Sequence, residues 1–245
     1  MNPAQFYTGL VVDAYAKLKS AHFDAAPYAG FISRTGEPAL ELGCGDGEPL
    51  LSLVAQGFAV SGVDSSADML ARCRANAAAR GVEVTLHHQP MESLSLPGRY
   101  RSIFLAGPTF NLLPDDETAL RALKAIRAHL TDDGAALIPL WIPDPSTDLG
   151  VPREAEGDDG SLLRYTPLSE TYDPVARTRV TTSRYERLTA TGSETAGREW
   201  ILHWHTPAQF RALCAEAALT VTALLDDNGD PAPSGATDFT AVVRP

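Results

Sequence analysis

The sequence contains little cysteine, and it has no long apolar run. Its three cysteines are Cys44, Cys73 and Cys214, a spacing that fits neither a disulfide framework nor a zinc site. No stretch is apolar over the length of a membrane span, and the first residues lack the basic start of a signal peptide. We therefore expect a cytoplasmic protein without disulfides and without a metal site.

Basic residues are also scarce. The 20 Lys and Arg stand against 31 Asp and Glu, so the formal net charge is −11 at pH 7. Nucleic acids and anionic membrane surfaces bind clustered cations, whereas the basic residues here are scattered along the chain. The composition therefore argues against both of these partners and favours a small-molecule substrate. We expect a monomer or a homodimer.

A glycine-rich stretch, residues 38–48, organises the rest of the chain. Its apolar start predicts a short buried strand, and glycines at positions 43, 45 and 47 leave room for a tight turn and for a ligand close to the backbone. A helix is expected over residues 48–56, and its free N-terminal amides favour a strongly polar group. Residues 58–63 predict a second strand that ends in Asp64, where an acid can accept both hydroxyls of a ribose. This order of parts predicts a nucleoside site, although three glycines alone serve ordinary turns about as often.

Two nucleoside cofactors compete for such a site. The dinucleotide fingerprint is G-x-G-x-x-G, and Glu48 occupies the position of its third glycine. The segment Glu41-Leu-Gly43-Cys-Gly45-Asp-Gly47 instead resembles motif I, E-x-G-x-G-x-G, of the class I S-adenosylmethionine-dependent methyltransferases. The resemblance continues through residues 62–70, 100–103 and 130–137, and it covers residues 38–141.

The resemblance implies an α/β fold: a Rossmann-like, seven-stranded, doubly wound sheet with an N-terminal helical lid and a three-stranded antiparallel insertion after the fifth strand. One methyltransferase domain is expected over residues 1–245. Its expected parts are the lid (1–35), the cofactor-binding core (36–142), a loop and the insertion (143–205), and the end of the core sheet (206–245).

Periodicity places the elements of this architecture. Helices are expected over residues 3–20, 24–32, 116–130 and 206–217. Core strands are expected over residues 82–87, 100–106, 135–142, 219–225 and 238–243, and insertion strands over 162–172, 178–188 and 198–205. Residues 143–160 are rich in Pro, Asp and Gly and predict a long surface loop.

The resemblance also implies a set of residues that bind S-adenosylmethionine and its product S-adenosylhomocysteine. These are Glu41, Gly43, Cys44, Gly45, Gly47, Asp64, Ser65, Met69, Gln89, Pro90, Met91 and Gly107. The family usually places an acid for the adenine amino group where this chain has Pro90, which offers neither a side-chain acceptor nor a backbone donor. Adenine would then be read by Gln89, by the Met91 amide, or by apolar contact with Met91.

Substrate residues are expected from three separated parts of the chain, and they should enclose one mostly apolar cavity. The candidates are Tyr7 and Tyr15 in the lid, Phe110 and Asn111 after the fourth strand, Trp141 at the end of the fifth strand, and Trp200 in the insertion. In the strand over 198–205, Trp200 and Leu202 face one way and His203 and His205 the other, and either face could line the cavity. Neutral histidine is a suitable base near pH 7, so His203 and His205 are the catalytic candidates.

The implied activity is transfer of a methyl group to an O, N or C nucleophile of a small molecule, for example in specialised metabolism. Two alternatives remain open. One is a non-methylating reaction on the same cofactor, such as a cyclisation, and the other is a non-catalytic interaction subunit. Fold alone does not separate these three functions.

Overall fold

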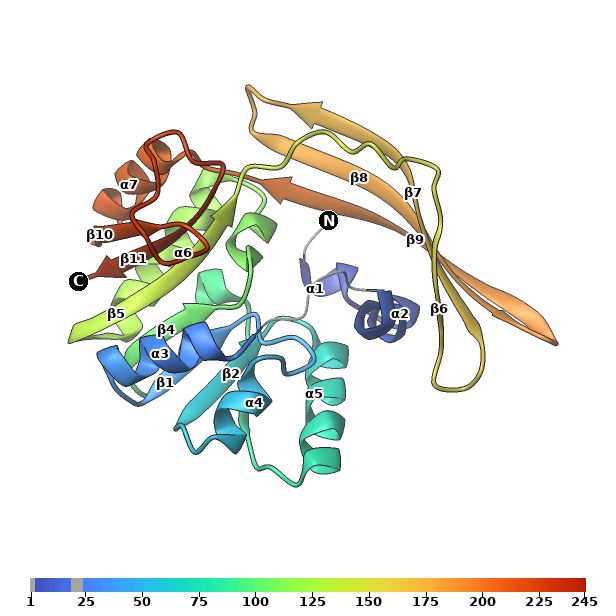
Figure 1. Ribbon diagram of the computed structural model, residues 1–245, viewed down its shortest axis with the longest axis horizontal. Coiled ribbons are helices and arrows are strands. Elements are labelled where there is room, and N and C mark those ends of the chain that lie inside the picture. Colours follow the sequence, from blue (N-terminus) through green and yellow to red (C-terminus); the bar gives the residue numbers. More distant parts are fainter. Residues whose placement is uncertain (1–2, 19–23) are drawn as a thin grey trace.

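The computed structural model describes residues 3–18 and 24–245, so residues 19 and 20 of the expected first helix lie outside the described part. Two β-sheets dominate the structure (Figure 1). The larger sheet has seven strands in the order β10-β11-β5-β4-β1-β2-β3, and the smaller has four in the order β6-β7-β8-β9. The predicted fold class is confirmed, with one correction to the insertion.

The seven-stranded sheet is parallel through its centre and antiparallel at one edge. Strands β1 to β5 pair in parallel, while β11 pairs antiparallel with β5 and with β10. Its strands are β1 (Ala39–Leu42), β2 (Val60–Asp64), β3 (Thr85–His88), β4 (Tyr100–Leu105), β5 (Leu130–Trp141), β10 (Thr220–Leu225) and β11 (Asp238–Arg244). Strand β5 begins five residues before its predicted start, because the polar residues ahead of Ala135 extend the strand.

Helices cover both faces of this sheet, as a parallel sheet requires. They are α3 (Ala26–Thr35), α4 (Leu50–Ala55), α5 (Ala67–Arg80), α6 (Asp116–His129) and α7 (Pro207–Glu216). Alternate residues of β1 enter different cores: Leu40 and Leu42 pack with residues of α6 and α7, whereas Ala39 packs with residues of α3, α4 and α5. Strand β1 is buried along its whole length, which agrees with the apolar side chains at three of its four positions.

The insertion has four strands, so the prediction of three was wrong. They are β6 (Arg153–Glu156), β7 (Leu162–Asp173), β8 (Thr178–Thr189) and β9 (Gly192–His203). Strand β6 lies inside the predicted loop 143–160, and it forms by antiparallel pairing with β7. Polar residues mask it in the sequence, because β6 is an exposed edge strand with no alternating apolar face.

The N-terminal helices α1 (Pro3–Phe6) and α2 (Leu10–Leu18) lie between the two sheets (Figure 1). Phe6, Leu10, Val11 and Ala14 share a small apolar core with Leu163 and Tyr185 of the insertion. On the polar side, Asp13 pairs with Arg72 of α5 and with Arg187 of β8. The two helices thus join the core to the insertion. Among the described helices, none has the length and apolar character needed to cross a bilayer.

Candidate functional site

The glycine loop begins where β1 ends, and its backbone conformation requires glycine. The amides of Gly43 and Cys44 both donate to the Val63 carbonyl, at 2.8 and 2.9 Å, which folds the loop back over β2. Gly43 and Gly47 have φ of 73° and 102°. A side chain is strained at such angles, and a Cβ on Gly43 would lie 2.5 Å from the Thr109 methyl group. The loop therefore stays close to the turn after β4.

Asp64 stands at the end of β2, beside this loop. Its Oδ2 accepts the Gly45 amide at 2.8 Å, and its Oδ1 accepts the Ser66 amide at 2.8 Å. Burial raises the pKa of the Asp64 carboxyl, and the hydrogen bonds from the Ser66 and Gly45 amides oppose that rise. Each carboxylate oxygen has a second lone pair, so Asp64 can still accept hydroxyl groups from a ligand.

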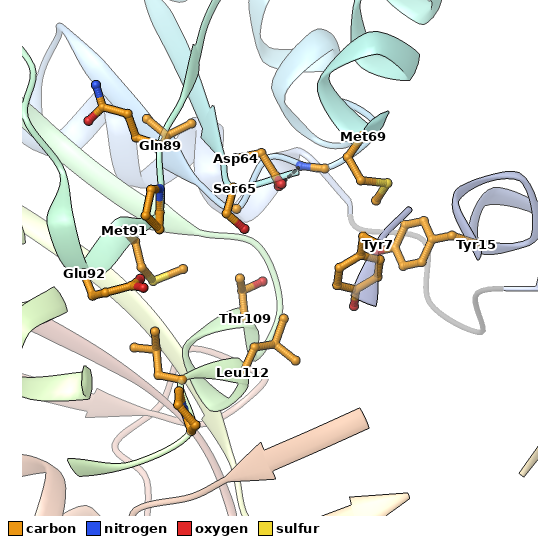
Figure 2. Close-up of a pocket in the computed structure, with 16 residues that line it drawn as sticks. Tyr7, Tyr15, Asp64, Ser65, Met69, Gln89, Met91, Glu92, Thr109 and Leu112 are labelled. Carbon is orange, nitrogen blue, oxygen red and sulfur yellow. Dashed lines mark hydrogen bonds between the residues drawn. The ribbon is translucent and has the colours of Figure 1, made fainter. Parts of the chain in front are cut away.

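A cavity in two adjoining parts lies in front of the loop and Asp64, and Figure 2 shows residues that line the first part. The first part is about 90 Å³ and the second about 260 Å³, so each alone is smaller than the roughly 300–1,000 Å³ common for ligand pockets. Both parts share Tyr7, Tyr15, Gly43, Gly45, Thr109 and Leu112. The first part adds Asp64, Ser65, Met69, Gln89, Pro90, Met91, Glu92 and their neighbours, and the second adds Cys44, Asp46, Glu48, Trp141, Trp200 and Leu202.

The cavity is acidic and aromatic. Asp64 and Glu92 line the first part and Asp46 and Glu48 the second, whereas no Lys, Arg or His is among the described lining residues. Glu48 is paired with Arg80, which lies outside the lining. Carboxylates and aromatic rings both attract cations, so the cavity favours a positively charged ligand over an anion.

Two tyrosines of the N-terminal segment line the cavity: Tyr7 follows α1 directly, and Tyr15 lies in α2. The rings of Tyr7 and Tyr15 meet edge to face with centroids 5.5 Å apart. Burial raises the pKa of Tyr15 to about 12 and that of Tyr7 well above its ordinary value. Both phenols are therefore neutral at pH 7. They can hold a polar group by hydrogen bonding, but neither is present as a phenolate base.

Comparison with known protein families identifies the part of the chain that carries the glycine loop and Asp64. The family described as a methyltransferase domain matches residues 39–134, which run from β1 to the start of β5. Residues 39–134 form a methyltransferase domain. The family resemblance read from motif I is thereby confirmed.

Relatives extend the likeness beyond the methyltransferase domain. A dTDP-3-amino-3,6-dideoxy-alpha-D-glucopyranose N,N-dimethyltransferase from Streptomyces fradiae is 30% identical over 154 residues, and the match covers 59% of this chain and 59% of that enzyme. The structure of the CcbJ methyltransferase from Streptomyces caelestis has a TM-score of 0.77 at 22% identity, covering 98% of this chain and 97% of that one. The S-adenosylmethionine-bound structure of CalS10, an amino pentose methyltransferase from Micromonospora echinaspora, has a TM-score of 0.68 at 23% identity, covering 96% and 97%. The solved structures establish the shared fold.

The end of β3 supplies the methyltransferase domain with an acid that the sequence reading missed. Gln89 lines the cavity, but its side-chain amide is turned away (Figure 2). The Gln89 Oε1 atom accepts the Ser95 amide at 2.7 Å, and its Nε2 donates to the Ser95 carbonyl at 3.1 Å. Glu92, in the 3-10 turn Met91–Ser93, lines the cavity beside Met91. The family resemblance places this acid at position 90, whereas in the structure the acid that lines the cavity is Glu92, two residues later.

Three residues of the predicted cofactor set do not line the cavity. Glu41 is fully buried beneath the loop, and neither carboxylate oxygen has a hydrogen-bond partner among the described residues. Burial, together with nearby acids, raises the pKa of Glu41 well above its ordinary value. Gly47 lies against Leu51, and the Gly107 amide donates to the Tyr28 hydroxyl at 3.2 Å. These residues support the loop and the turn after β4 from behind.

Phe110 and Asn111 also lie outside the cavity lining. The 3-10 turn Thr109–Leu112 directs Thr109 and Leu112 toward the cavity and buries the two residues between them. Asn111 Nδ2 donates to the carbonyls of Trp141, at 2.7 Å, and His203, at 3.2 Å, and its Oδ1 accepts the Trp141 amide at 3.2 Å. Asn111 therefore joins the ends of β5 and β9, and in this way it fixes the backbone of a cavity residue, Trp141.

His203, the last residue of β9, and His205, two residues beyond it, lie away from the cavity, near the start of α6. His205 Nε2 is 2.9 Å and His203 Nε2 is 3.5 Å from Oδ1 of Asp116. Both rings are buried, and neither residue lines the cavity. The structure thus places the two catalytic candidates away from the glycine loop, because it is the Trp200 and Leu202 face of β9 that covers the cavity.

Asp116, His203 and His205 together offer the ligand atoms of a possible metal site, one carboxylate and two imidazoles. Two observations favour a hydrogen-bonded cluster instead. Arg177 already pairs with Asp116. The Nδ1 atoms of both histidines are buried without a partner among the described residues, whereas a metal-bound histidine normally donates through its second nitrogen. His205 Nε2–H therefore donates to the carboxylate.

We expect His205 to make stability depend on pH. Burial, helped by the nearby His203, lowers the pKa of His205 from 6.5 to about 4. Between these two values the unfolded chain binds a proton that the folded protein excludes. The free energy of unfolding should therefore fall as the pH drops from about 6.5 to about 4, by about 3 kcal/mol from this group.

Urea denaturation of the wild type and of His205→Gln at pH 7 and pH 4.5 tests this dependence. The wild type should have the larger free energy of unfolding at pH 7, and the difference from His205→Gln should be smaller at pH 4.5. A constant difference between the two proteins would show that His205 keeps an ordinary pKa in the fold.

Proposed function

We propose that this protein transfers a methyl group from S-adenosylmethionine to an amine of a small molecule. The observation that carries the proposal is the acidic and aromatic cavity without a basic side chain in its described lining. Such a lining suits a sulfonium cofactor and an amine that becomes an ammonium cation. The relative from Streptomyces fradiae is named for N-methylation of an amino sugar, which supports an amine acceptor.

The residues of the first cavity part fit the cofactor. Asp64 would accept the ribose hydroxyls with its remaining lone pairs, and the glycine loop would hold the amino-acid portion close to its backbone. Glu92 would accept the adenine amino group, with Met91 giving apolar contact. When bound, the cofactor supplies an activated methyl group. The chain's own contribution is then alignment, since an intrinsically reactive methyl group needs little further activation.

The second part of the cavity would hold the acceptor. Trp141, Trp200 and Leu202 give it an apolar wall, and Asp46 adds a carboxylate. An acceptor amine held there would take the methyl group that the bound cofactor would supply, with S-adenosylhomocysteine as the other product. Because the nitrogen becomes positive, the carboxylate and the rings stabilise the product ammonium. An unprotonated amine needs no base at this step, which agrees with the position of His203 and His205 outside the cavity.

Calorimetry and a paired acceptor assay test the proposal. We expect micromolar binding of S-adenosylmethionine and S-adenosylhomocysteine and no binding of NAD, because Glu48 stands where a dinucleotide site needs glycine. With labelled cofactor, an amino sugar should be methylated and its hydroxyl analogue should not. Tight NAD binding without a response to either adenosyl ligand would overturn the cofactor assignment, and methylation of the hydroxyl analogue alone would overturn the amine assignment.

The same experiment separates the alternatives. A non-methylating enzyme would bind the cofactor but leave the mass of every acceptor without an added methyl group. An interaction subunit would bind neither adenosyl ligand. The proposal also keeps the expected setting, a cytoplasmic enzyme of specialised metabolism that acts as a monomer or a homodimer, and size-exclusion chromatography with light scattering gives the oligomeric state.

A further inference from the structure

A third cavity, of about 370 Å³, lies beside the acceptor part on the insertion sheet. Residues 145–148 line one side of it. The sheet contributes Arg153 of β6, Tyr165 and Pro167 of β7, and Arg179 and Thr181 of β8. Trp200 lines both this cavity and the acceptor part, so the two spaces adjoin at this residue. A substrate that passes Trp200 would occupy both.

The third cavity differs in charge from the other two, because two arginines and one acid, Asp148, line it. It contains two guanidinium groups, Arg153 and Arg179, whereas the cofactor and acceptor parts contain no cation among their described lining residues. The Arg179 side chain is 9% exposed and lies over the Trp141 ring, with its Cζ 5.1 Å from the ring centroid. The Arg153 side chain is 46% exposed and lies over Tyr165, at 4.9 Å. Both guanidinium groups thus lie over aromatic rings.

The nearby acids do not saturate these arginines. Glu170 accepts the Ser146 amide at 2.9 Å, the Ser146 hydroxyl, and the Thr181 hydroxyl at 3.3 Å, and it stays 3.6 Å from Arg179 Nε. Arg179 Nε is buried without a hydrogen-bond partner among the described residues, although its Nη1 donates to the Asp144 carbonyl at 2.7 Å. Asp148 forms an ion pair with Arg153 at 3.7 Å, which is beyond hydrogen-bond distance and leaves the guanidinium donors of Arg153 available.

We propose that this third cavity binds an oxyanion, a phosphate or a carboxylate, on the same molecule whose amine enters the acceptor part. Guanidinium groups with free donors bind such oxyanions through charge-assisted hydrogen bonds. The link to the amine rests on the proposed function, whereas the oxyanion site itself does not. The substrate class is therefore a zwitterion in which the methylated amine and the anionic group lie on opposite sides of Trp200.

Direct binding of small anions tests the oxyanion site without any methyl transfer. Calorimetry with inorganic pyrophosphate and with citrate, each in the absence of cofactor, shows which oxyanion class binds. We expect Arg153→Gln to weaken binding of the preferred anion about tenfold or more, as the loss of a charged hydrogen bond implies. Arg153 lies on an exposed edge strand, so its replacement should leave the fold intact, and circular dichroism checks this.

Arg184→Gln is the matched control. Arg184 lies on the same strand as Arg179 but on its opposite, exposed face, so its replacement should leave anion binding unchanged. If neither anion binds the wild type, or if Arg184→Gln weakens binding as much as Arg153→Gln, the oxyanion site is disproved. Anion binding that is lost in Arg179→Gln as well would support the site independently of the edge strand.

A second readout separates this site from the cofactor site. S-adenosylmethionine should bind Arg153→Gln as it binds the wild type. If the wild type binds pyrophosphate or citrate but no adenosyl ligand, the proposed function fails and the oxyanion site stands. With an active enzyme, Arg153→Gln should raise KM and leave kcat unchanged for an anionic amine, and it should change neither constant for an uncharged one. Equal effects on both acceptors would disprove the claim that the anion and the methylated amine belong to one substrate molecule.

Discussion

Replacement of Asp64 by alanine is expected to raise the dissociation constant for S-adenosylmethionine by roughly 30- to 1,000-fold. This range corresponds to about 2–4 kcal/mol, the loss of a charged acceptor by two ribose hydroxyls. The amides of Gly45 and Ser66 lose the same acceptor. The fold should survive, because the carboxyl lies at the end of β2 rather than inside a core. Calorimetry gives the affinity and thermal unfolding gives the stability.

A ligand pair distinguishes ribose binding from support of the loop. Adenosine should lose affinity in Asp64→Ala, whereas 2′,3′-dideoxyadenosine, which lacks both hydroxyls, should bind the two proteins almost equally weakly. Asp132→Ala is the control, since the Asp132 side chain is 91% exposed and lies far along the chain on β5. An equal loss for both nucleosides would mean that Asp64 acts through the loop alone.

Replacement of Gly47 by alanine is expected to lower the free energy of unfolding by about 2–5 kcal/mol and to abolish cofactor binding. Gly47 has φ of 102°, an angle that alanine rarely adopts. A Cβ there would lie 2.8 Å from Leu51 Cδ1 and 2.9 Å from Cys73 Sγ, both buried in the core beneath the loop. The strain and the overpacking add, and the loop must move to relieve them.

Gly197→Ala provides the comparison for this substitution. Gly197 lies in β9, has no positive φ, and has open space around the position of a Cβ. Its replacement should change stability by less than about 0.5 kcal/mol, as is usual for surface positions. Urea denaturation measures both variants. A Gly47→Ala protein of wild-type stability and affinity would show that the loop adopts another backbone conformation in solution.

The cofactor end of the site was predictable because it depends on local backbone requirements. Glycines at positions 43, 45 and 47 predict a tight turn, and all three have positive φ in the structure. The strand periods predicted the order of the core elements and placed Asp64 at the end of β2. Tyr7, Tyr15, Trp141 and Trp200 do line the cavity, as expected from the topology of the fold.

The other predicted residues depended on which face of an element is covered, and the sequence leaves that open. Alternation along β9 showed that Trp200 and His203 face opposite ways, but only packing against the core decided that the tryptophan faces the cavity. The turn after β4 likewise buries Phe110 and Asn111 because its direction is set by contacts with β5 and β9. Strand β6 is stabilised by antiparallel pairing with β7 and not by an apolar pattern of its own.

Local sequence patterns are enough to predict the glycine loop, the acid at the end of β2 and the parallel core, because positive φ angles and apolar periods are properties of neighbouring residues. Packing between distant segments decides the lining of the acceptor part, the acid near β3 that lines the cofactor part, and the third cavity with its two arginines. The physical reason is that side chains such as Glu92 and Arg179 acquire their surroundings from segments far away in the chain, through burial and charge that no local pattern contains.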